Sequence, residues 1–341
     1  MKLRRLLGVF AIFWLTAAIS QLQGQDKVEY FDKKANKVAT YSGDIKEDTV
    51  SGVKISVAKK EIPVDASDIT RVSYQDLPAV LKLEYGATLT AEDKKEYAKA
   101  LSAYKDVLTK VPAGLKSRRQ IEYRVAMLSA QLADTVENGN TIATDLLAKY
   151  IKDNPTGWQF SSAGKTLARM QLAADKFDDA LVTLEAMEKA PNMPKEIKQE
   201  VELMTIDLLI RSDKVDQAAA RITNAMASLQ ANDPQRQRLS IYQIGADKAM
   251  KGPEKIVKLE GLINGTNDEV LRALGYNTLG DTYQAEKRQR DAMWAYLWVD
   301  VVYNKEKSEH MKAMDRLAKL FDAMNDPDRA KQYKDKLARM K

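Results

Sequence analysis

The 341-residue chain contains no cysteine and only one histidine, His310. Without cysteine the chain has no disulfide bond, no thiolate nucleophile and no cysteine for a lipoprotein anchor. A single histidine removes the commonest zinc ligand and the usual proton carrier of acid–base relays. We therefore expect no metal and no cofactor. His310, near the start of the last helical unit, is expected to have a structural role.

Enzymatic motifs are also scarce. The 48 Asp and Glu residues are too many for any one pair to stand out as a glycosidase couple. The stretch Ser162 to Thr166 ends in the Gly-Lys-Thr of a phosphate-binding loop. However, Gln159 occupies the place of the first glycine, and no apolar strand precedes it. We interpret this stretch as part of a repeat helix and expect no enzyme activity. An enzyme of unfamiliar type would need a deep pocket with converging carboxylates.

Residues 1–24 have the features of a secretory signal peptide. A basic start leads into the apolar run Leu6 to Ile19, which is short for a membrane span. Cleavage is expected after Gly24 or after Ser20, and the alternative is a segment retained as an anchor. We expect a periplasmic or secreted protein with no stable membrane insertion once the signal is removed. The formal charge of +6 is scattered and partly belongs to this segment, so we do not expect nucleic acid as a partner.

A small β-patterned module is predicted over residues 25–76. Apolar residues alternate at Val53, Ile55 and Val57, and Ser51-Gly52 supplies a turn. Four or five short strands can bury one face only by curling into a small barrel. In length and strand rhythm the module resembles SH3-like and Sm-like small barrels, which bind peptides or nucleic acid in other proteins. Because its lysines are offset by acidic residues, we interpret its surface as a solvated mixture of charges.

Residues 77–341 have a helical pattern that repeats. Small or branched apolar residues recur at spacings of 43, 37, 38, 38, 36 and 38, namely Ala100, Ala143, Ala180, Ala218, Ile256, Ala292 and Ala330. We call these residues the anchors. Five of the seven have a bulky apolar residue four positions later, on the same side of a helix. Such a fixed period predicts a mainly α solenoid of about seven helical hairpins.

Three units carry both halves of a two-helix motif. In the best unit Leu279-Gly280 and Tyr283 precede Ala292, Tyr296 and Val299. At these positions the chain resembles the tetratricopeptide-repeat family, here as an exported bacterial protein. Small residues let two helices cross closely while large ones fill the groove beside them. The unit around Ile256 departs from the motif, because it lacks the small residue and follows Gly252-Pro253.

The resemblance implies a partner-binding groove. In the family the first helices of the hairpins line a concave face that holds extended peptides or helices. By register, this face includes Lys165 and Arg169 in one unit and Asn277, Asp281 and Gln284 in another. The next unit after Lys165 lacks the residues of a carboxylate clamp, so that form of peptide binding is not supported.

Two tryptophans share one stripe of the helix that follows Ala292. Trp294 and Trp298 are four residues apart, and we expect them to pack against the hairpin from Met311 to Met324. If they are exposed instead, they become the leading partner site. The sequence thus predicts a noncatalytic protein-interaction scaffold of the cell envelope that binds a peptide or protein. The alternative is an envelope structural protein whose β module binds glycan or nucleic acid. The oligomeric state is left open.

Overall fold

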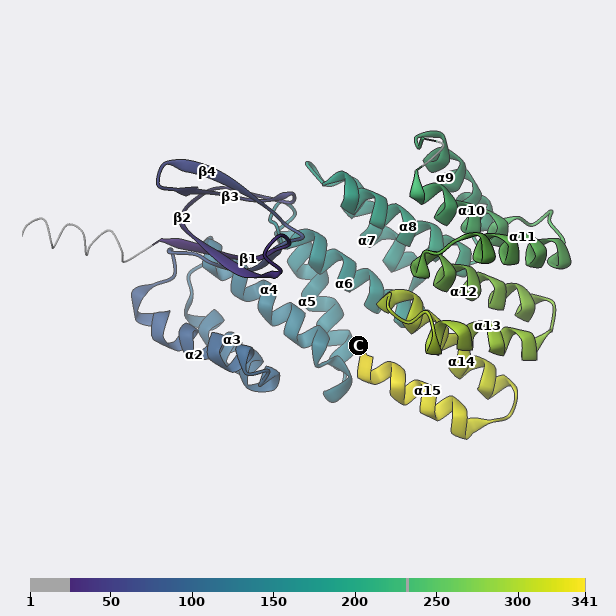
Figure 1. The fold of residues 1–341 in the computed structure, drawn as a ribbon. Coiled ribbons are helices and arrows are strands. Elements are labelled where there is room, and N and C mark those ends of the chain that lie inside the picture. Colours follow the sequence, from purple (N-terminus) through teal and green to yellow (C-terminus); the bar gives the residue numbers. More distant parts are fainter. Residues whose placement is uncertain (1–24, 231–232, 341) are drawn as a thin grey trace, which may run out of the picture. The chain divides into compact units, whose positions relative to one another are not determined.

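Five strands begin the part of the chain that is described by the computed structural model, which covers residues 25–230 and 233–340. The predicted signal peptide, residues 1–24, lies outside the described residues. The strands are β1 (Asp26–Asp32), β2 (Lys37–Thr49), β3 (Gly52–Val57), β4 (Lys60–Asp65) and β5 (Ile69–Ser73) (Figure 1). They pair antiparallel in the order β4-β3-β2-β1-β5. The predicted β module is therefore a five-stranded sheet.

The sheet is curled but open. The register of the β2–β3 pair shifts between Ile45 and Glu47, and such a bulge bends a sheet. Gly52 begins β3 with a φ of +144°, and a Cβ there would lie 2.1 Å from the carbonyl oxygen of Val64. Only glycine fits this turn. In the described residues β4 and β5 are edges that pair with no further strand. The resemblance to SH3-like or Sm-like barrels therefore stays a prediction.

Helices cover the apolar face of this sheet. The helices of this part are η1 (Ala79–Leu81), α2 (Lys82–Asp93), α3 (Tyr97–Lys110), α4 (Lys116–Gln131), η2 (Ala133–Thr135), α5 (Gly139–Asp153), α6 (Phe160–Ala173) and α7 (Phe177–Glu188). Val28, Ile55 and Val72 are fully buried in the sheet and share one apolar cluster with Tyr123 of α4 and Leu147 of α5. The sheet therefore shares one apolar core with α4, α5 and α6 in the first unit.

A buried carboxylate ties the sheet to the helices. Asp48, near the end of β2, accepts hydrogen bonds from the Tyr74 hydroxyl at 2.6 Å and from the backbone N–H of Trp158 at 3.2 Å. It also forms an ion pair with Arg119 of α4. Because Asp48 is nearly inaccessible, the guanidinium and the two donors compensate its lost hydration. Burial and the Asp48 charge raise the pKa of Tyr74, so its hydroxyl stays protonated and donates.

The second unit, Glu202–Lys341, is entirely helical in the residues described. α8 (Lys195–Arg211) crosses the boundary between the units. The remaining helices are α9 (Val215–Ala227), α10 (Pro234–Ala246), α11 (Gly252–Gly265), α12 (Glu269–Ala285), α13 (Gln289–Val301), α14 (Lys307–Ala323) and α15 (Pro327–Met340) (Figure 1). Consecutive helices pack against each other, and the first helices α10, α12 and α14 also contact one another in turn. The described helices from α2 to α15 form seven hairpins, so the predicted mainly α solenoid is confirmed.

The anchors pack where the two helices of each hairpin cross. Six of them are fully buried, and Ile256 is 7% exposed. The close crossing is clearest at Gly280 of α12, where a Cβ would lie 2.3 Å from Cε1 of the Tyr296 ring. Tyr296 is itself fully buried four residues after the anchor Ala292. The small residues of the motif thus let helices approach, and the large ones fill the space that remains.

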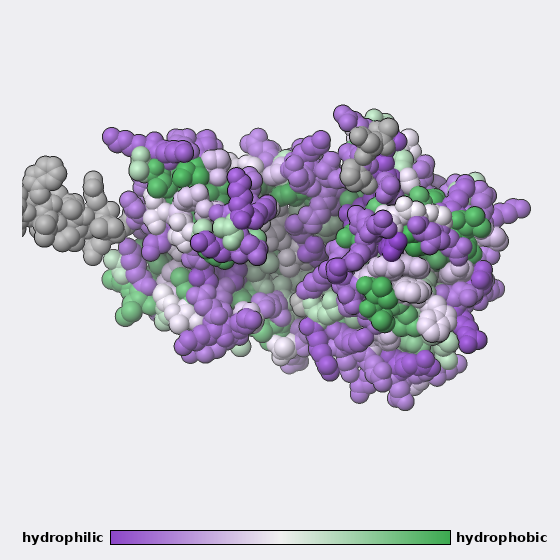
Figure 2. Space-filling view, in the orientation of Figure 1, coloured by the Kyte–Doolittle hydropathy of each residue, from purple (hydrophilic) through white to green (hydrophobic). Residues whose placement is uncertain are grey.

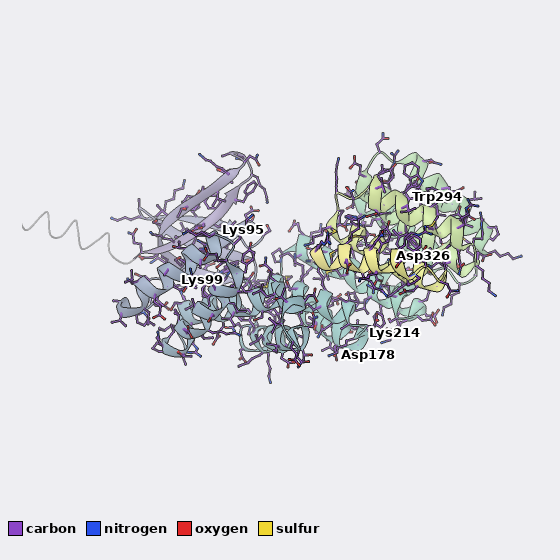
Figure 3. The ribbon with its side chains drawn as sticks, turned by 90° about the horizontal axis from the view of Figure 1, so that it is seen from below. Lys95, Lys99, Asp178, Lys214, Trp294 and Asp326 are labelled. Carbon is purple, nitrogen blue, oxygen red and sulfur yellow. The ribbon has the colours of Figure 1, made fainter. Side chains whose placement is uncertain are left out.

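A left-handed residue marks the turn inside nearly every hairpin. Six residues with positive φ lie five positions before an anchor: Lys95, Asn138, Asp175, Asp213, Lys287 and Asn325. In five of these turns, Asn138 excepted, the next residue donates its N–H to a carbonyl five positions back, the bond of a Schellman cap. Figure 3 labels three residues of such turns, Lys95, Lys214 and Asp326.

The unit around Ile256 departs from this rule, as its sequence indicates. The residue five positions before Ile256 is Lys251, which has a φ of −70° and precedes Gly252-Pro253 at the start of α11. The preceding helix ends at Ala246, and Asp247 then accepts the backbone N–H groups of Ala249 and Met250. An aspartate-centred turn therefore replaces the Schellman cap in this hairpin.

Candidate functional site

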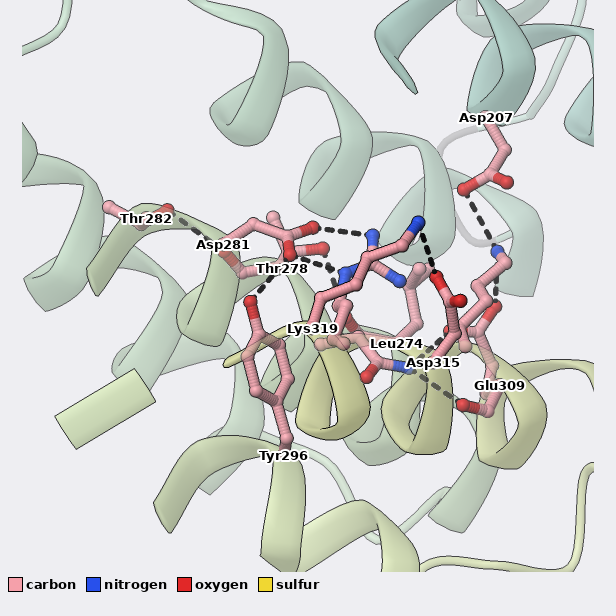
Figure 4. Close-up of polar contacts among 12 residues, drawn as sticks. Asp207, Leu274, Thr278, Asp281, Thr282, Tyr296, Glu309, Asp315 and Lys319 are labelled. Atoms are coloured by element: carbon pink, nitrogen blue, oxygen red, sulfur yellow. Dashed lines mark hydrogen bonds and ion pairs between the residues drawn. The ribbon is translucent and has the colours of Figure 1, made fainter. Parts of the chain in front are cut away.

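The first helices of the second unit are joined by an internal network of charges. Lys312 of α14 places its Nζ 2.9 Å from Oδ1 of Asp207 in α8 and 2.9 Å from Oε1 of Glu309 (Figure 4). One turn further on, Arg316 forms a two-pronged ion pair with Asp281 of α12, with Nη2 2.6 Å from Oδ2. These side chains fill the face on which the sequence places the partner groove.

The charges in this network stabilise one another. Burial disfavours a charged Lys312, but Asp207 and Glu309 outweigh it and raise the pKa of the ammonium. Burial likewise works against the Asp207 carboxylate, but Lys312 with Arg211 and Arg316 keeps its pKa below the usual value. Both partners are therefore ionised near neutral pH. An ion pair of this kind is costly to break by removing one member, because the other stays buried and charged.

Two of the predicted groove residues belong to this network. Asn277 is 2% exposed, and its Nδ2 donates to the carbonyl oxygen and to Oε2 of Glu309 at 3.0 and 2.8 Å. Asn277 is therefore covered by α14 in this structure, and its contact with a partner stays a prediction. Asp281 is engaged by Arg316 and accepts the Tyr296 hydroxyl at 2.8 Å. Gln284, at the end of α12, is exposed.

The other predicted groove residues lie on α6. Lys165 forms an ion pair with Glu200 at 2.9 Å, and Arg169 lies 3.7 Å from the same carboxylate. Arg169 is the more accessible of the two cations. The Gly-Lys-Thr stretch lies inside this regular helix, and the Thr166 hydroxyl donates to the carbonyl of Ser162. The interpretation as a repeat helix is confirmed.

The two tryptophans of α13 are exposed. Trp294 and Trp298 have exposed fractions of 55% and 45%, and Val301, one turn further, is also exposed. The expectation that they pack against the next hairpin is wrong. The buried residues of α13 are Ala292, Ala295, Tyr296, Val299 and Asp300. At 100° per residue the two tryptophans fall on the opposite side of the helix.

Stacked rings hold Trp298 in place. Its ring lies 5.8 Å from Tyr276 of α12 and 6.2 Å from Tyr303 after α13, centroid to centroid. The two tyrosines lie 5.5 Å apart, and all three rings are nearly parallel. Arg272 extends over the Tyr303 ring. We call the surface made by Tyr276, Trp294, Trp298, Val301 and Tyr303 the aromatic face. The sequence predicted the two tryptophans of this face but not Tyr276. Tyr276 lies on a different helix, α12, and belongs to no sequence motif.

Figure 2 shows a mainly hydrophilic surface on which apolar residues gather in separate patches. The other strongly exposed apolar side chains of the described residues are single or paired, such as Val80 and Leu83 at the first helix of the array and Val182 on α7. Trp294, labelled in Figure 3, lies instead on the same side of α13 as Trp298, whose ring stacks with those of Tyr276 and Tyr303. Exposed apolar groups of this size usually mark an interaction surface.

The edges of the sheet are less suited to binding an extended peptide. β4 contains Pro63, which has no N–H to donate to an added strand. On β5, the Arg71 side chain forms an ion pair with Asp93 at the end of α2, 2.5 Å away. The β4 edge thus lacks one donor, and the β5 edge carries a charged side chain that is held by α2.

Histidine and acidic clusters form no metal centre in the described residues. The His310 ring nitrogen Nε2 lies 2.8 Å from Oδ1 of Asp300, which also binds Lys336 and accepts the Tyr333 hydroxyl at 3.2 Å. This places His310 in a contact between α13, α14 and α15, in keeping with a structural role. Among the helices of residues 25–230 and 233–340, none has the length and hydropathy that crossing a bilayer requires.

The fold is that of tetratricopeptide-repeat proteins. A tetratricopeptide repeat protein from Parabacteroides merdae has a similar structure, with a TM-score of 0.52 and 13% identity over 77% of this chain and 94% of that one. Weaker similarities link the chain to the apo quorum sensor NprR of B. thuringiensis, with a TM-score of 0.40, 12% identity and 75% of each chain covered. The Rap conjugation gene regulator of plasmid pLS20 is similar with a TM-score of 0.38 and 11% identity, over 78% of this chain and 76% of that one. No protein-family model and no curated protein sequence matches the chain.

Proposed function

We propose that this protein is a noncatalytic interaction scaffold of the bacterial cell envelope that binds a protein or peptide partner through the aromatic face. The observation that carries the proposal is the exposure of Trp294 and Trp298 on a helix whose other side is fully packed. Large aromatic side chains contribute most to binding when they are held in one conformation before the partner arrives. The stack with Tyr276 and Tyr303 supplies that order for Trp298.

The face of the first helices is a weaker candidate within the second unit. Lys312, Arg316 and Asp281 are already engaged with one another and with Asp207. A partner that used Lys312 would have to break its largely buried pair with Asp207, which costs about 3–5 kcal/mol in typical proteins. Partner contact stays a prediction for all five groove residues, Lys165, Arg169, Asn277, Asp281 and Gln284.

Export is part of the proposal and rests on the sequence of residues 1–24. A basic start, an apolar run of fourteen residues and a small residue at the cut are the marks of a cleavable signal. Expression of the full chain in a bacterium, cell fractionation and intact-mass measurement would test it. A mass that begins after Gly24 or Ser20 in the periplasmic fraction supports export, and an uncleaved chain in the cytoplasm contradicts it.

Site-specific cross-linking tests the interaction itself. A photoreactive amino acid at Trp294 should produce a discrete cross-linked species in cells that make the full chain. The same amino acid at Val182 is the matched control, because Val182 is 67% exposed on α7, the second helix of another hairpin. Equal cross-linking at both positions, or none at Trp294, would contradict partner binding at the aromatic face.

A further inference from the structure

The exposed side of α13 has an apolar middle, with one basic residue near the start of the helix and another in the turn that follows it. Trp294, Trp298 and Val301 follow one another at intervals of four and three residues. Arg290 lies one turn before Trp294 on the same side, is exposed, and has no ion pair among the described residues. Lys305 lies in the turn between α13 and α14, four residues after the end of the row, is 75% exposed, and is paired in the described residues only with Glu269 of α12 at 2.8 Å. An exposed pair of this kind contributes little and can exchange for another carboxylate.

We propose that the aromatic face binds an amphipathic α-helix of a partner protein whose apolar side is flanked by carboxylates. This inference rests on the proposed function and adds the chemistry of the partner. The apolar row from Trp294 to Val301 is about 10 Å long at 1.5 Å per residue, which equals two turns of a facing helix. A helix with apolar residues at i, i+4 and i+7 matches the row, and acidic residues one turn beyond each end meet Arg290 and Lys305.

A second copy of this chain fits the face less well. In a two-fold symmetric pair of α13 helices that run antiparallel, Arg290 of each copy would meet Lys305 of the other. In a parallel pair each cation would meet its own equivalent. Both arrangements bring like charges together at the rim of the apolar row, which costs binding energy. A partner with opposite charge at these two places removes that repulsion.

Two designed peptides provide the test. Both are 18-residue helical peptides with leucine at i, i+4 and i+7 and with alanine and glutamine at the other positions. One turn beyond each end of the leucine row, the first peptide carries glutamate and the second carries lysine. Binding of each labelled peptide to the full chain is measured by fluorescence anisotropy. We expect the glutamate peptide to bind at least 10-fold more tightly than the lysine peptide, and the difference to shrink as the salt concentration rises.

Variants of the chain locate the binding. Trp294→Ala and Trp298→Ala should each weaken the glutamate peptide about 10-fold or more, while Val182→Ala on α7 should leave it unchanged. Arg290→Glu should weaken the glutamate peptide and strengthen the lysine peptide. Both tryptophans and Arg290 are exposed, so the fold should be retained, and circular dichroism checks this.

Three results would overturn the inference. Equal affinity for the two peptides would remove the role of charge. Dimerisation in light scattering that Trp294→Ala abolishes would identify the occupant as a second copy. Sedimentation with phosphatidylglycerol vesicles that depends on Trp294 would identify it as a lipid surface. Cross-linking at Trp294 in cells without any preference for the glutamate peptide would refute the helix chemistry alone, whereas loss of cross-linking would refute the proposed function as well.

Discussion

Lys312 and Asp207 form an ion pair although 105 residues separate them, with Nζ 2.9 Å from Oδ1. The pair joins α8 to α14. Each of these is the first helix of its hairpin, and two further hairpins lie between them in the sequence. Lys312 also binds Glu309, which in turn binds Asn277 of α12. One lysine therefore connects three hairpins. This long-range link differs from the usual contacts of a repeat array, in which each hairpin packs only against its neighbours.

Removing the lysine should destabilise the second unit strongly. In Lys312→Met, Asp207 and Glu309 stay buried without their cation, and we expect the free energy of unfolding to fall by about 3–5 kcal/mol. Hydrogen exchange of peptides from α8 and α14, together with urea denaturation, would measure the change. Combining Lys312→Met with Asp207→Leu should recover part of the loss, because no unpaired aspartate remains. A loss below 1 kcal/mol for Lys312→Met would show that the pair is solvated.

The same pair should make stability depend on acid. The pKa of Asp207 is lowered in the folded state, where Lys312 and two arginines outweigh the effect of burial. A carboxylate with a lowered pKa adds stability above its unfolded pKa of about 3.9, and that stability is lost as the pH falls through the folded pKa. The unfolding free energy of the unmodified chain should therefore drop more steeply below about pH 4 than that of Asp207→Asn. Denaturation curves between pH 2 and pH 7 would reveal the difference in slope, and equal slopes would contradict it.

Two helical glycines should respond in opposite directions to the same substitution. Gly280→Ala places a Cβ 2.3 Å from the buried Tyr296 ring, whose hydroxyl is held by Asp281. We expect a loss of about 1–3 kcal/mol from overpacking. Gly261→Ala in α11 meets nothing within 4 Å and should gain about 1 kcal/mol from helix propensity. Thermal denaturation of both variants tests the crossing, and a stabilised Gly280→Ala would show that α12 and α13 do not approach closely.

The repeat architecture could be predicted from the sequence because it depends on local spacing. A hairpin needs a small residue at the helix crossing and a large one four positions later, as at Ala180 and Leu184, so each unit records its own packing. The irregular unit around Ile256 was predictable for the same reason, since Gly252-Pro253 alters the turn before α11. The alternation at Val53, Ile55 and Val57 likewise showed strands. It carried no information about whether the sheet closes on itself or packs on α4 and α5.

The site was harder to predict because its residues come from separate parts of the chain. The pattern of α13 places Trp294 and Trp298 on one side, but which side a neighbouring hairpin covers depends on the angle at which α14 packs. Nothing in the local sequence joins Asp207 to Lys312, and the burial of Asn277 follows from Glu309, one hairpin later. Prediction therefore succeeded where the interaction lies within one repeat and failed where it lies between repeats.

The turns inside the hairpins carry a remaining prediction, because most of their left-handed residues are not glycine. Lys95 has a φ of +61° and Lys287 a φ of +60°, a conformation that costs a residue with a Cβ about 1 kcal/mol relative to glycine. Lys95→Gly and Lys287→Gly should therefore raise the free energy of unfolding by up to about 1 kcal/mol each, since the left-handed position at a helix end favours glycine. The matched control is Lys105→Gly in the interior of α3, exposed like Lys95, which should lower it by about 1 kcal/mol. Thermal melts of the three variants test this prediction. If Lys95→Gly and Lys105→Gly shift the melting temperature in the same direction, the turn at Lys95 does not have left-handed geometry.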